Sequence, residues 1–329
     1  MTIEYNEEQH NETRAGFVAI VGAPNAGKST FLNTCIGEKV AIVSPKEQTT
    51  RFNIRAVLTE GQNQFIFVDT PGIHKARRMF DEAMVNTALE ASINADVILF
   101  LVDIKRGFTD EVLEIIEHLK EVRRIKKVFA FNKADLVKDK KDILPKLEEV
   151  KEKYGDLFED YMIISANKNQ GTSDVLDTLA KHIPESPLLY SEDYLTDLPM
   201  KLIASEETRE KAFYLLQNEI PYSMMVETLE YKVNPDDGSV RIEQVLLLER
   251  EAHKKIVVGN KGQMIKKIGM TARKALEEFL QVKVHLFLRV KVQPNWAQDN
   301  FYYKMFGLDK PKDSKFEDTN KKSHKRKRK

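Results

Sequence analysis

The sequence contains very little cysteine: Cys35 is the only one among 329 residues. A single cysteine cannot form a disulfide within its own chain, which agrees with a reducing compartment. We expect Cys35 to be a small buried hydrophobic residue.

Long hydrophobic runs are also missing. The longest, Val-Ile-Leu-Phe-Leu-Val at residues 97–102, has six residues, whereas a helix needs about 20 to cross a bilayer. The first ten residues are polar and acidic, and they lack the basic start and apolar stretch of a secretion signal. With 42% hydrophobic and 31% charged residues, the composition is ordinary for a soluble globular protein. We therefore expect a cytoplasmic protein, and its length predicts two domains.

Charge is distributed unevenly, although the net charge is only +1. Residues 321–329 contain seven Lys or Arg and no acidic residue, so removing these seven charges leaves −6 for residues 1–320. A solvated disordered tail and direct contact with the phosphates of nucleic acid or anionic lipid are equally good interpretations of this run.

Short apolar runs alternate with helix-length amphipathic segments as far as about residue 185. The runs lie at residues 17–21, 54–58, 65–68, 97–102, 128–131 and 161–164. This alternation predicts an α/β fold with a mostly parallel sheet and helices on both faces. Pro184, Pro187 and Pro199 then stand among Ser, Asp and Glu residues and indicate a boundary. We expect a flexible N-terminus at residues 1–14, an α/β domain at 15–185 and a linker at 186–200.

A different order of elements follows, over residues 201–299. Two β-rich runs, residues 224–233 and 240–248, flank a segment containing Asp237-Gly238, which is a strong hairpin signal. Helix-like segments surround the hairpin and a strand-like run ends the domain, so the order is α-β-β-α-α-β. Residues 300–329 are polar and charged without periodicity, and we expect a disordered extension there.

Residues 22–29 read Gly-Ala-Pro-Asn-Ala-Gly-Lys-Ser and fit the phosphate-binding pattern Gly-x-x-x-x-Gly-Lys-Ser/Thr. The motif follows an apolar run and continues into a helix-forming segment, as a P-loop requires. In such a loop, Lys28 reaches the β- and γ-phosphates and Ser29 offers a hydroxyl to Mg²⁺. A plain strand-to-helix turn is the alternative, but a chance match is rare, on the order of one in a hundred.

Asp69-Thr70-Pro71-Gly72 follows a second apolar run, which places it at the carboxyl end of the sheet. Asp69 would hold Mg²⁺ through water there, and the N–H of Gly72 would contact the γ-phosphate. Taken alone, this motif is better explained as a proline-containing turn that closes a strand. The upstream P-loop motif favours the nucleotide interpretation.

Asn132-Lys133-Ala134-Asp135 follows a third apolar run and decides the base. The carboxylate of Asp135 can accept from two N–H groups on the guanine edge, whereas adenine would leave it unpaired. GTP is therefore predicted over ATP, although Asn132 or Asp135 could simply cap the following helix. After the last run, Ser165-Ala166-Asn167 could donate a backbone N–H to guanine O6.

These motifs predict one nucleotide site with Lys28 and Gly72 as catalytic residues. The expected GTP-binding residues are Gly22, Ala23, Pro24, Asn25, Ala26, Gly27, Lys28, Ser29, Thr30, Asp69, Thr70, Pro71, Gly72, Ile73, Asn132, Lys133, Ala134, Asp135, Ser165 and Ala166. The Mg²⁺ ligands that the motifs predict are Ser29 and, through water, Asp69.

Together the four motifs resemble those of the translation-factor-related GTPases. In that superfamily a switch threonine ligates Mg²⁺ and contacts the γ-phosphate. The resemblance assigns this role to Thr50, as a further catalytic residue and Mg²⁺ ligand, with the adjacent Thr49 as its rival. Ile73 stands where Ras-like enzymes carry the glutamine that positions the attacking water, so slow intrinsic hydrolysis is implied. Asn25, after Pro24, resembles the ligand with which some members recruit K⁺ in place of an arginine finger.

Residues 259–262, Gly-Asn-Lys-Gly, match the Gly-x-x-Gly loop with which KH domains clamp single-stranded RNA. The bare motif is weak, but its position between two helices of an α-β-β-α-α-β order resembles the type II KH fold. Nearby lysines could neutralise phosphates, although exposed lysines also occur on any soluble domain. The expected RNA-binding residues are Val258, Gly259, Asn260, Lys261, Gly262, Lys266 and Lys267.

A GTPase domain followed by a type II KH domain resembles the Era family of ribosome-associated GTPases. The resemblance extends to about Asp299 and is strongest at four stretches: residues 48–51 (Gln-Thr-Thr-Arg), 219–223 (Glu-Ile-Pro-Tyr-Ser), 256–262 and 290–297. It implies GTP- or GDP-dependent binding of the 3′ end of 16S-type ribosomal RNA during maturation of the small ribosomal subunit. It also implies peripheral association with the cytoplasmic face of the inner membrane. Separately, we expect a monomer. The basic extension departs from the family pattern.

Three alternatives stay open at this point. The protein could be an RNA-binding module in which GTP is only a structural ligand, or a GTP-regulated RNA chaperone with another RNA target. It could also be a peripheral membrane GTPase anchored mainly by residues 321–329.

Overall fold

The computed structural model describes residues 13–44, 50–73, 76, 78–217, 219–312 and 314. These residues form two compact units. The first comprises described residues up to Ala41, from Asn53 to residue 73 and from Asn86 to Asp197. The second comprises those from Ile42 to Phe52, from Ala76 to Val85 and from Leu198 onward. Two short segments from early in the chain therefore belong to the second unit.

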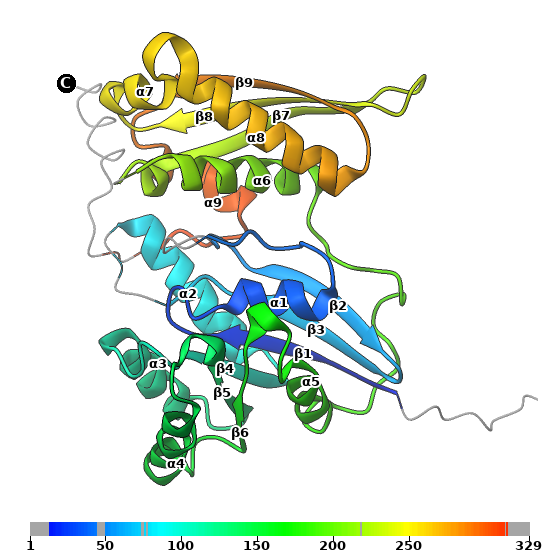
Figure 1. Cartoon of the computed structure of the whole chain (residues 1–329), viewed down its shortest axis with the longest axis vertical. Helices are drawn as coiled ribbons and strands as arrows, with labels where there is room; N and C mark the ends of the chain where they lie inside the picture. Colours follow the sequence, from blue (N-terminus) through cyan, green and yellow to red (C-terminus); the bar gives the residue numbers. More distant parts are fainter. Residues whose placement is uncertain are drawn as a thin grey trace, which may run out of the picture. The chain divides into compact units, whose positions relative to one another are not determined.

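The first unit is built on a six-stranded sheet with the order β2-β3-β1-β4-β5-β6 (Figure 1). Its strands are β1 (Arg14–Val21), β2 (Ile54–Glu60), β3 (Asn63–Asp69), β4 (Val97–Asp103), β5 (Lys126–Asn132) and β6 (Asp160–Ile163). Only β2 runs antiparallel to its neighbour. The helices are α1 (Lys28–Ile36), α3 (Asp110–Glu121), α4 (Ile143–Tyr154), α5 (Thr172–Ala180) and the later part of α2 (Met79–Ile93).

The middle of this sheet is buried, and its strand ends carry the polar motifs. Every residue of β4 is buried, so the sheet is covered on both faces, as a continuous apolar run predicts. On one of these faces α1 and α5 lie side by side (Figure 1). Because β1, β3, β4 and β5 are parallel, their carboxyl ends meet at one edge, with Asp69 opposite Ile20 and Asn132 opposite Asp103.

The second unit contains a three-stranded sheet with the order β7-β8-β9, in which β7 and β8 are antiparallel and β8 and β9 parallel. The strands are β7 (Met224–Val233), β8 (Val240–Leu248) and β9 (Val284–Val292). The helices are α6 (Met200–Leu215), α7 (Glu251–Val258), α8 (Gln263–Leu280) and α9 (Asn300–Met305), with the 3-10 turns η4 (Pro221–Ser223), η5 (Asn260–Gly262) and η6 (Trp296–Gln298). The expected order α-β-β-α-α-β from α6 to β9 is confirmed.

The core of this unit lies on one face of its sheet. Phe213 of α6, Leu246 of β8 and Ile268 of α8 are buried in one apolar cluster. Along β9, half-buried side chains alternate with exposed ones after a buried Val284, as expected for a strand with one open face. This arrangement leaves α7, the 259–262 loop and the start of α8 at the surface.

The disordered extension does not begin at residue 300, and that expectation is wrong. Residues 300–305 form α9, and Tyr302, Tyr303 and Phe306 are buried. The sequence shows no helical periodicity here because the ordered segment is short. It is held by aromatic side chains that pack against Phe80 and Trp296 of the same unit. The basic run 321–329, residues 1–12 and Thr49 lie outside the described residues.

Two sequence expectations concern single features of the fold. Cys35 is free and half-buried on α1, and burial raises the pKa of its thiol to about 12, so it stays protonated at neutral pH. Among the described residues, no helix is both long enough and apolar enough to cross a membrane.

Candidate nucleotide site and RNA-binding loop

The loop between β1 and α1 has an unusual backbone. Asn25 and Gly27 have positive φ angles of 63° and 97°. Gly27 is the N-cap residue of α1, so the unpaired N–H groups at the start of this helix border the loop. Loop and helix together provide the donors that bind phosphate in this motif.

Two glycines in this loop have no room for a side chain. A Cβ on Gly22 would press against the carbonyl oxygen of Leu101, and one on Gly27 would press against the side-chain amide nitrogen of Asn132. A Cβ on Gly72 would lie 2.9 Å from the Cα of Pro24. The motif glycines therefore allow the loop, the end of β5 and the segment after β3 to approach one another closely.

Lys28 is buried at the base of the loop. Its ammonium donates hydrogen bonds to the carbonyl oxygens of Gly22, at 3.0 Å, and Ala23, at 3.2 Å. Burial lowers the pKa of Lys28 to about 8, against the opposing effect of the Asp69 carboxylate. A polyanion beside this ammonium would stabilise its charged form, because opposite charge favours ionisation.

Ser29 and Asp69 lie together. The hydroxyl of Ser29 donates a 2.7 Å hydrogen bond to Oδ2 of Asp69, which is fully buried. Hydroxyl and carboxylate oxygens are the donors that Mg²⁺ prefers, so the two predicted ligands fit this ion. The neighbouring Thr70 instead donates to the carbonyl oxygen of Ile20 at 2.8 Å, which ties β3 to β1.

Asn132 joins the phosphate side of the site to the base side. Its amide nitrogen donates to the carbonyl oxygen of Ala26 at 2.9 Å. Its amide oxygen accepts from the backbone N–H of Lys133, at 2.8 Å, and from that of Ala166, at 3.0 Å. Since Asn132 is 1% exposed, it acts as a buried connector of three motifs and does more than cap a helix.

Asp135 is exposed and is oriented by Ser165. The hydroxyl of Ser165 donates a 2.5 Å hydrogen bond to Oδ1 of Asp135. The sequence pointed only to the backbone after Ser165, so this side-chain contact was missed. It holds the carboxylate beside Ser165, the residue before Ala166, whose N–H donates to Oδ1 of Asn132.

Asp103 is a further residue that sequence reasoning missed. It ends β4, and its Oδ2 lies 2.8 Å from Nζ of Lys133, which also donates to the carbonyl oxygen of Asn25. Lys133 therefore connects β4, β5 and the P-loop. The signal was present, because an acidic residue directly after the apolar run 97–102 falls at the same sheet edge as Asn132.

The predicted catalytic residues are not all in one unit. Gly72 and Ile73 belong to the first unit, and Ile73 is buried and apolar. Thr50 is buried too, but it belongs to the second unit. Its roles as Mg²⁺ ligand and as switch threonine remain predictions.

The 259–262 loop makes a tight turn between α7 and α8. Gly259, Lys261 and Gly262 have positive φ angles of 72°, 47° and 79°. A Cβ on Gly259 would lie 2.8 Å from the Cβ of Met264, so glycine is required there. Asn260 and Lys261 are exposed at the tip. The loop thus presents a short, uncrowded backbone to solvent, as clamping of RNA requires.

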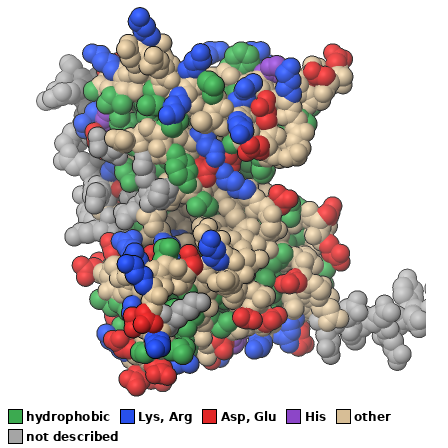
Figure 2. Space-filling model, viewed as in Figure 1, with side chains coloured by type: hydrophobic (Ala, Val, Ile, Leu, Met, Phe, Trp, Pro, Cys, Tyr) green, Lys and Arg blue, Asp and Glu red, His purple; other side chains and the backbone are tan. Residues whose placement is uncertain are grey.

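The helices around this loop carry the expected basic residues. In the view of Figure 2, Lys and Arg side chains predominate over Asp and Glu on the surface formed by α7 and α8. Lys266 and Lys267 are exposed on α8. Ile256 on α7 is 53% exposed, and such an apolar side chain beside the loop is a candidate contact for a nucleobase that the sequence predictions omitted.

Comparison with known proteins identifies both halves of the chain. A family model described as "50S ribosome-binding GTPase" matches residues 17–133, and a KH-domain model matches residues 219–297. GTPase Era of Brucella suis biovar 1 is 45% identical over 307 residues, which cover 93% of this chain and 96% of that protein. GTPase Era of Rhizobium meliloti is 47% identical over 300 residues, covering 91% and 94%. The chain belongs to the GTPase Era family.

Solved Era structures share the fold of this Era-family chain. A variant of Aquifex aeolicus Era bound to GDP·AlF4⁻ has a TM-score of 0.85 and 37% identity, covering 90% of this chain and 99% of that one. The same values describe Era in complex with MgGDPNP and nucleotides 1506–1542 of 16S ribosomal RNA. The expected fold class, a P-loop GTPase domain with a mostly parallel sheet followed by a KH domain, is confirmed, and this Era-family protein is a GTPase.

Proposed function

We propose that this Era-family GTPase uses GTP binding and hydrolysis to control how its KH domain binds the 3′ end of 16S-type ribosomal RNA. The protein acts, on this proposal, in assembly and maturation of the small ribosomal subunit. Its nucleotide partners are GTP and GDP.

One observation carries the proposal. Buried Asn132 connects the P-loop, through Ala26, to the guanine-reading segment, through Ala166, in a chain that also presents an exposed Gly-x-x-Gly loop between two basic helices. A phosphate site and a guanine site linked in this way favour GTP, and the second unit supplies an RNA-binding loop. The solved complex of Era with MgGDPNP and a 16S ribosomal RNA fragment supports the same pairing of ligands.

Crosslinking in cells followed by sequencing of the bound RNA tests this function, with the protein captured in GTP-bound and GDP-bound forms. We expect reads concentrated at the 3′ end of the small-subunit RNA, with an enrichment that depends on nucleotide. Reads spread over messenger RNA, without enrichment at that end, would favour an RNA chaperone with another target.

The proposal includes Mg²⁺ as cofactor and slow, assisted hydrolysis. Ser29 and Asp69 supply oxygen ligands for Mg²⁺, which would neutralise charge developing on the phosphates. Ile73 has no group that could orient a water molecule, so a partner or K⁺ bound at Asn25 would supply the missing stabilisation. Turnover several-fold faster in KCl than in NaCl supports the K⁺ site, and equal turnover removes it.

A second part of the proposal concerns location. The basic run 321–329 would attract a monomeric, cytoplasmic protein to the anionic face of the inner membrane, because clustered Lys and Arg bind anionic lipid. Sedimentation with vesicles containing anionic lipid tests this. Loss of co-sedimentation on deletion of residues 321–329 supports membrane contact, and equal sedimentation of both chains opposes it.

A further inference from the structure

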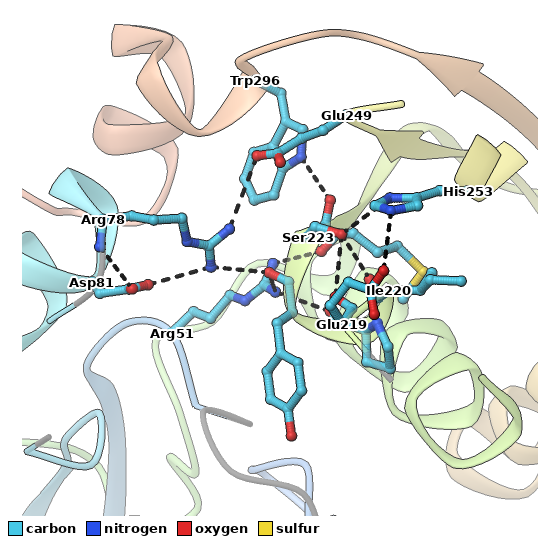
Figure 3. Close-up of polar contacts among 12 residues, drawn as sticks. Arg51, Arg78, Asp81, Glu219, Ile220, Ser223, Glu249, His253 and Trp296 are labelled. Atoms are coloured by element: carbon cyan, nitrogen blue, oxygen red, sulfur yellow. Dashed lines mark hydrogen bonds and ion pairs between the residues drawn. The ribbon is translucent and has the colours of Figure 1, made fainter. Parts of the chain in front are cut away.

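Four consecutive backbone carbonyl oxygens, those of Pro221, Tyr222, Ser223 and Met224, accept hydrogen bonds from distant side chains of the second unit (Figure 3). We call these four groups the carbonyl row. Carbonyl groups at the end of a helical turn lack intrahelical partners and carry partial negative charge. The row is therefore a binding site for positively charged donors.

Arg51 makes most of these contacts. Its Nη1 donates to the carbonyl oxygen of Met224 at 2.7 Å. Its Nη2 donates to those of Tyr222, at 3.0 Å, and Pro221, at 3.3 Å. Its Cζ lies 5.6 Å from the centroid of the Trp296 ring. Arg51 is 3% exposed; burial lowers the pKa of its guanidinium, which stays charged because that pKa starts far above neutral.

Arg78 binds the same row from a second segment. Its Nη2 donates to the carbonyl oxygen of Tyr222 at 3.1 Å and to Oδ1 of Asp81 at 3.3 Å. Its Nη1 lies 3.9 Å from Oε1 of Glu249. Figure 3 shows the side chains of Arg51 and Arg78 converging on the region beside Ser223.

Aromatic packing strengthens the attachment of both segments. Phe52 directly follows Arg51, and its ring stacks on that of Phe306 at 5.2 Å between centroids. Phe80 contacts the same Phe306 ring at 6.0 Å and the Trp296 ring at 5.8 Å. Each arginine is thus accompanied by a buried phenylalanine.

These two segments are adjacent in sequence to predicted nucleotide contacts. Arg51 directly follows Thr50, the predicted ligand of Mg²⁺, and Arg78 lies five residues after Ile73, a predicted contact of the nucleotide. The N-terminal end of the segment 42–52 is attached to α6 of the same unit. The N–H of Val43 donates to Oε1 of Glu210 at 3.0 Å, and its carbonyl oxygen accepts from the hydroxyl of Tyr214 at 3.2 Å.

The carbonyl row continues toward the RNA-binding loop. Oγ of Ser223 lies 3.3 Å from Nδ1 of His253, a buried residue of α7. Nε2 of His253 lies 3.7 Å from Oε1 of Glu219, just before η4. Helix α7 ends at Val258, and the 259–262 loop begins at the next residue.

We propose that Arg51 and Arg78 couple the nucleotide state to RNA affinity by binding the carbonyl row, which is joined through Ser223 and His253 to α7 and the 259–262 loop. This inference rests on the proposed function, and it makes both arginines positioning residues. A position of the guanidinium between bound and released is unfavourable, because it would leave a buried charge and buried carbonyl groups without hydrogen-bond partners. A displacement of Thr50 on loss of the γ-phosphate would therefore be passed to the row as a discrete change.

The test measures RNA affinity in two nucleotide states. A fluorescent oligonucleotide with the sequence of the small-subunit RNA 3′ end is titrated with full-length protein in the presence of GDPNP or GDP. The ratio of the two dissociation constants is the coupling factor, which typically lies between about 5 and 150 in allosteric proteins. By reciprocity, RNA should change the affinity for GDPNP relative to GDP by the same factor.

We expect Arg51→Gln and Arg78→Gln to reduce this factor to within about twofold of 1, with GDP affinity in the absence of RNA retained. Arg51→Lys should also fail, because one ammonium cannot reproduce the planar fork that reaches three carbonyl groups. Loss of the buried Arg51 could destabilise the second unit. The side chain of Arg78 is 34% exposed, so we expect Arg78→Gln to fold and to keep the test decisive. The matched control is Arg55→Gln. The side chain of Arg55 is 55% exposed, and its Nη1 makes a long ion pair, 3.9 Å, with Oδ2 of Asp197.

Each outcome decides between the inference and the function on which it rests. Folded Arg51 and Arg78 variants that keep the wild-type factor would overturn the inference alone. A wild-type factor of 1 would overturn both the inference and the nucleotide control of RNA binding in the proposed function. Absence of RNA binding by the wild type in both nucleotide states would instead overturn the proposed function. A reduced factor in the two variants, with a wild-type factor in Arg55→Gln, supports the coupling role.

Discussion

The hydroxyl of Ser165 donates a 2.5 Å hydrogen bond to Oδ1 of Asp135. The two residues lie in different loops, after β6 and β5, and the bond fixes the orientation of an exposed carboxylate. The carboxylate predicted to read the base is therefore positioned by a side chain 30 residues further along the chain.

Replacing Ser165 with Ala should weaken guanine-nucleotide binding modestly. One hydrogen bond to an exposed carboxylate contributes about 1 kcal/mol, so we expect GDP affinity to fall about fivefold. Ser165→Thr keeps a hydroxyl and is the control. Fluorescence titration with a labelled GDP measures the effect, and equal affinity of the Ala and wild-type proteins would show that the bond has no positioning role.

Replacing Asp135 with Asn should change the base that is accepted. The amide presents one acceptor and one donor, so it mismatches the two N–H groups of guanine and matches the carbonyl and N–H of xanthine. We expect GDP affinity to fall by about 100-fold or more, with XDP becoming the better ligand. Competition of GDP and XDP against one labelled nucleotide measures this exchange. Unchanged preference for GDP would remove Asp135 from the base site.

Nucleotide binding should take up a proton at Lys28 above pH 8. Burial lowers the pKa of its ammonium to about 8 in the protein without nucleotide, and phosphates would raise it again. Below pH 8 the group is already charged; above it, binding must protonate it, so affinity falls as the pH rises through 8. Calorimetry at pH 7.5 and about 8.5, in buffers of different ionisation enthalpy, measures the uptake.

Lys28→Arg is the control for this pH dependence, because a guanidinium stays charged at both pH values. Protonation changes of the nucleotide itself are common to both proteins. Equal proton uptake by wild type and the Arg variant would show that Lys28 does not titrate on binding.

Gly27→Ala should disrupt the nucleotide site, whereas Gly37→Ala should only reduce stability. Both glycines have positive φ, 97° and 76°, so alanine at either costs about 1–2 kcal/mol of folding free energy. Only at Gly27 would the new Cβ push on the amide of Asn132; nothing lies within 4 Å at Gly37. Urea unfolding and GDP binding separate the two effects. Full GDP affinity in Gly27→Ala would contradict the connecting role of Asn132.

Lys261→Asp should reduce RNA affinity without changing GTP hydrolysis in the absence of RNA. Lys261 is exposed and has a φ of 47°, a conformation that Asp adopts more easily than most residues. We expect RNA to bind about tenfold more weakly. The slope of log affinity against log salt concentration should become shallower by about 0.7 for each phosphate that the variant no longer neutralises.

Lys274→Asp is the matched control for the loop variant. Its side chain is 77% exposed on α8, in the half of the helix that is distant from the loop. Anisotropy titrations over a range of KCl concentrations compare the two. Equal weakening by both variants would indicate a general charge effect in place of a specific interaction at the loop.

Much of the nucleotide site could be predicted from short motifs. Ser29, Asp69 and Asn132 follow buried apolar runs, and parallel strands necessarily bring such positions to one edge. Asp103 obeys the same rule and was missed because a single aspartate after a strand forms no motif. The contact of Ser165 with Asp135 was also beyond the sequence, since it depends on side-chain rotamers in two loops.

The sequence by itself determined that phosphates and guanine are bound and that two domains of different element order follow one another, because periodicity and short motifs are local properties of the chain. Only the tertiary structure decided that residues 42–52 and 76–85 belong to the second unit. Three stretches that carried the family resemblance, containing Arg51, Tyr222 and Trp296, meet there at one row of carbonyl groups. Every residue has the same carbonyl group, so no residue type could indicate which three of them would receive the arginines and which one the indole N–H of Trp296.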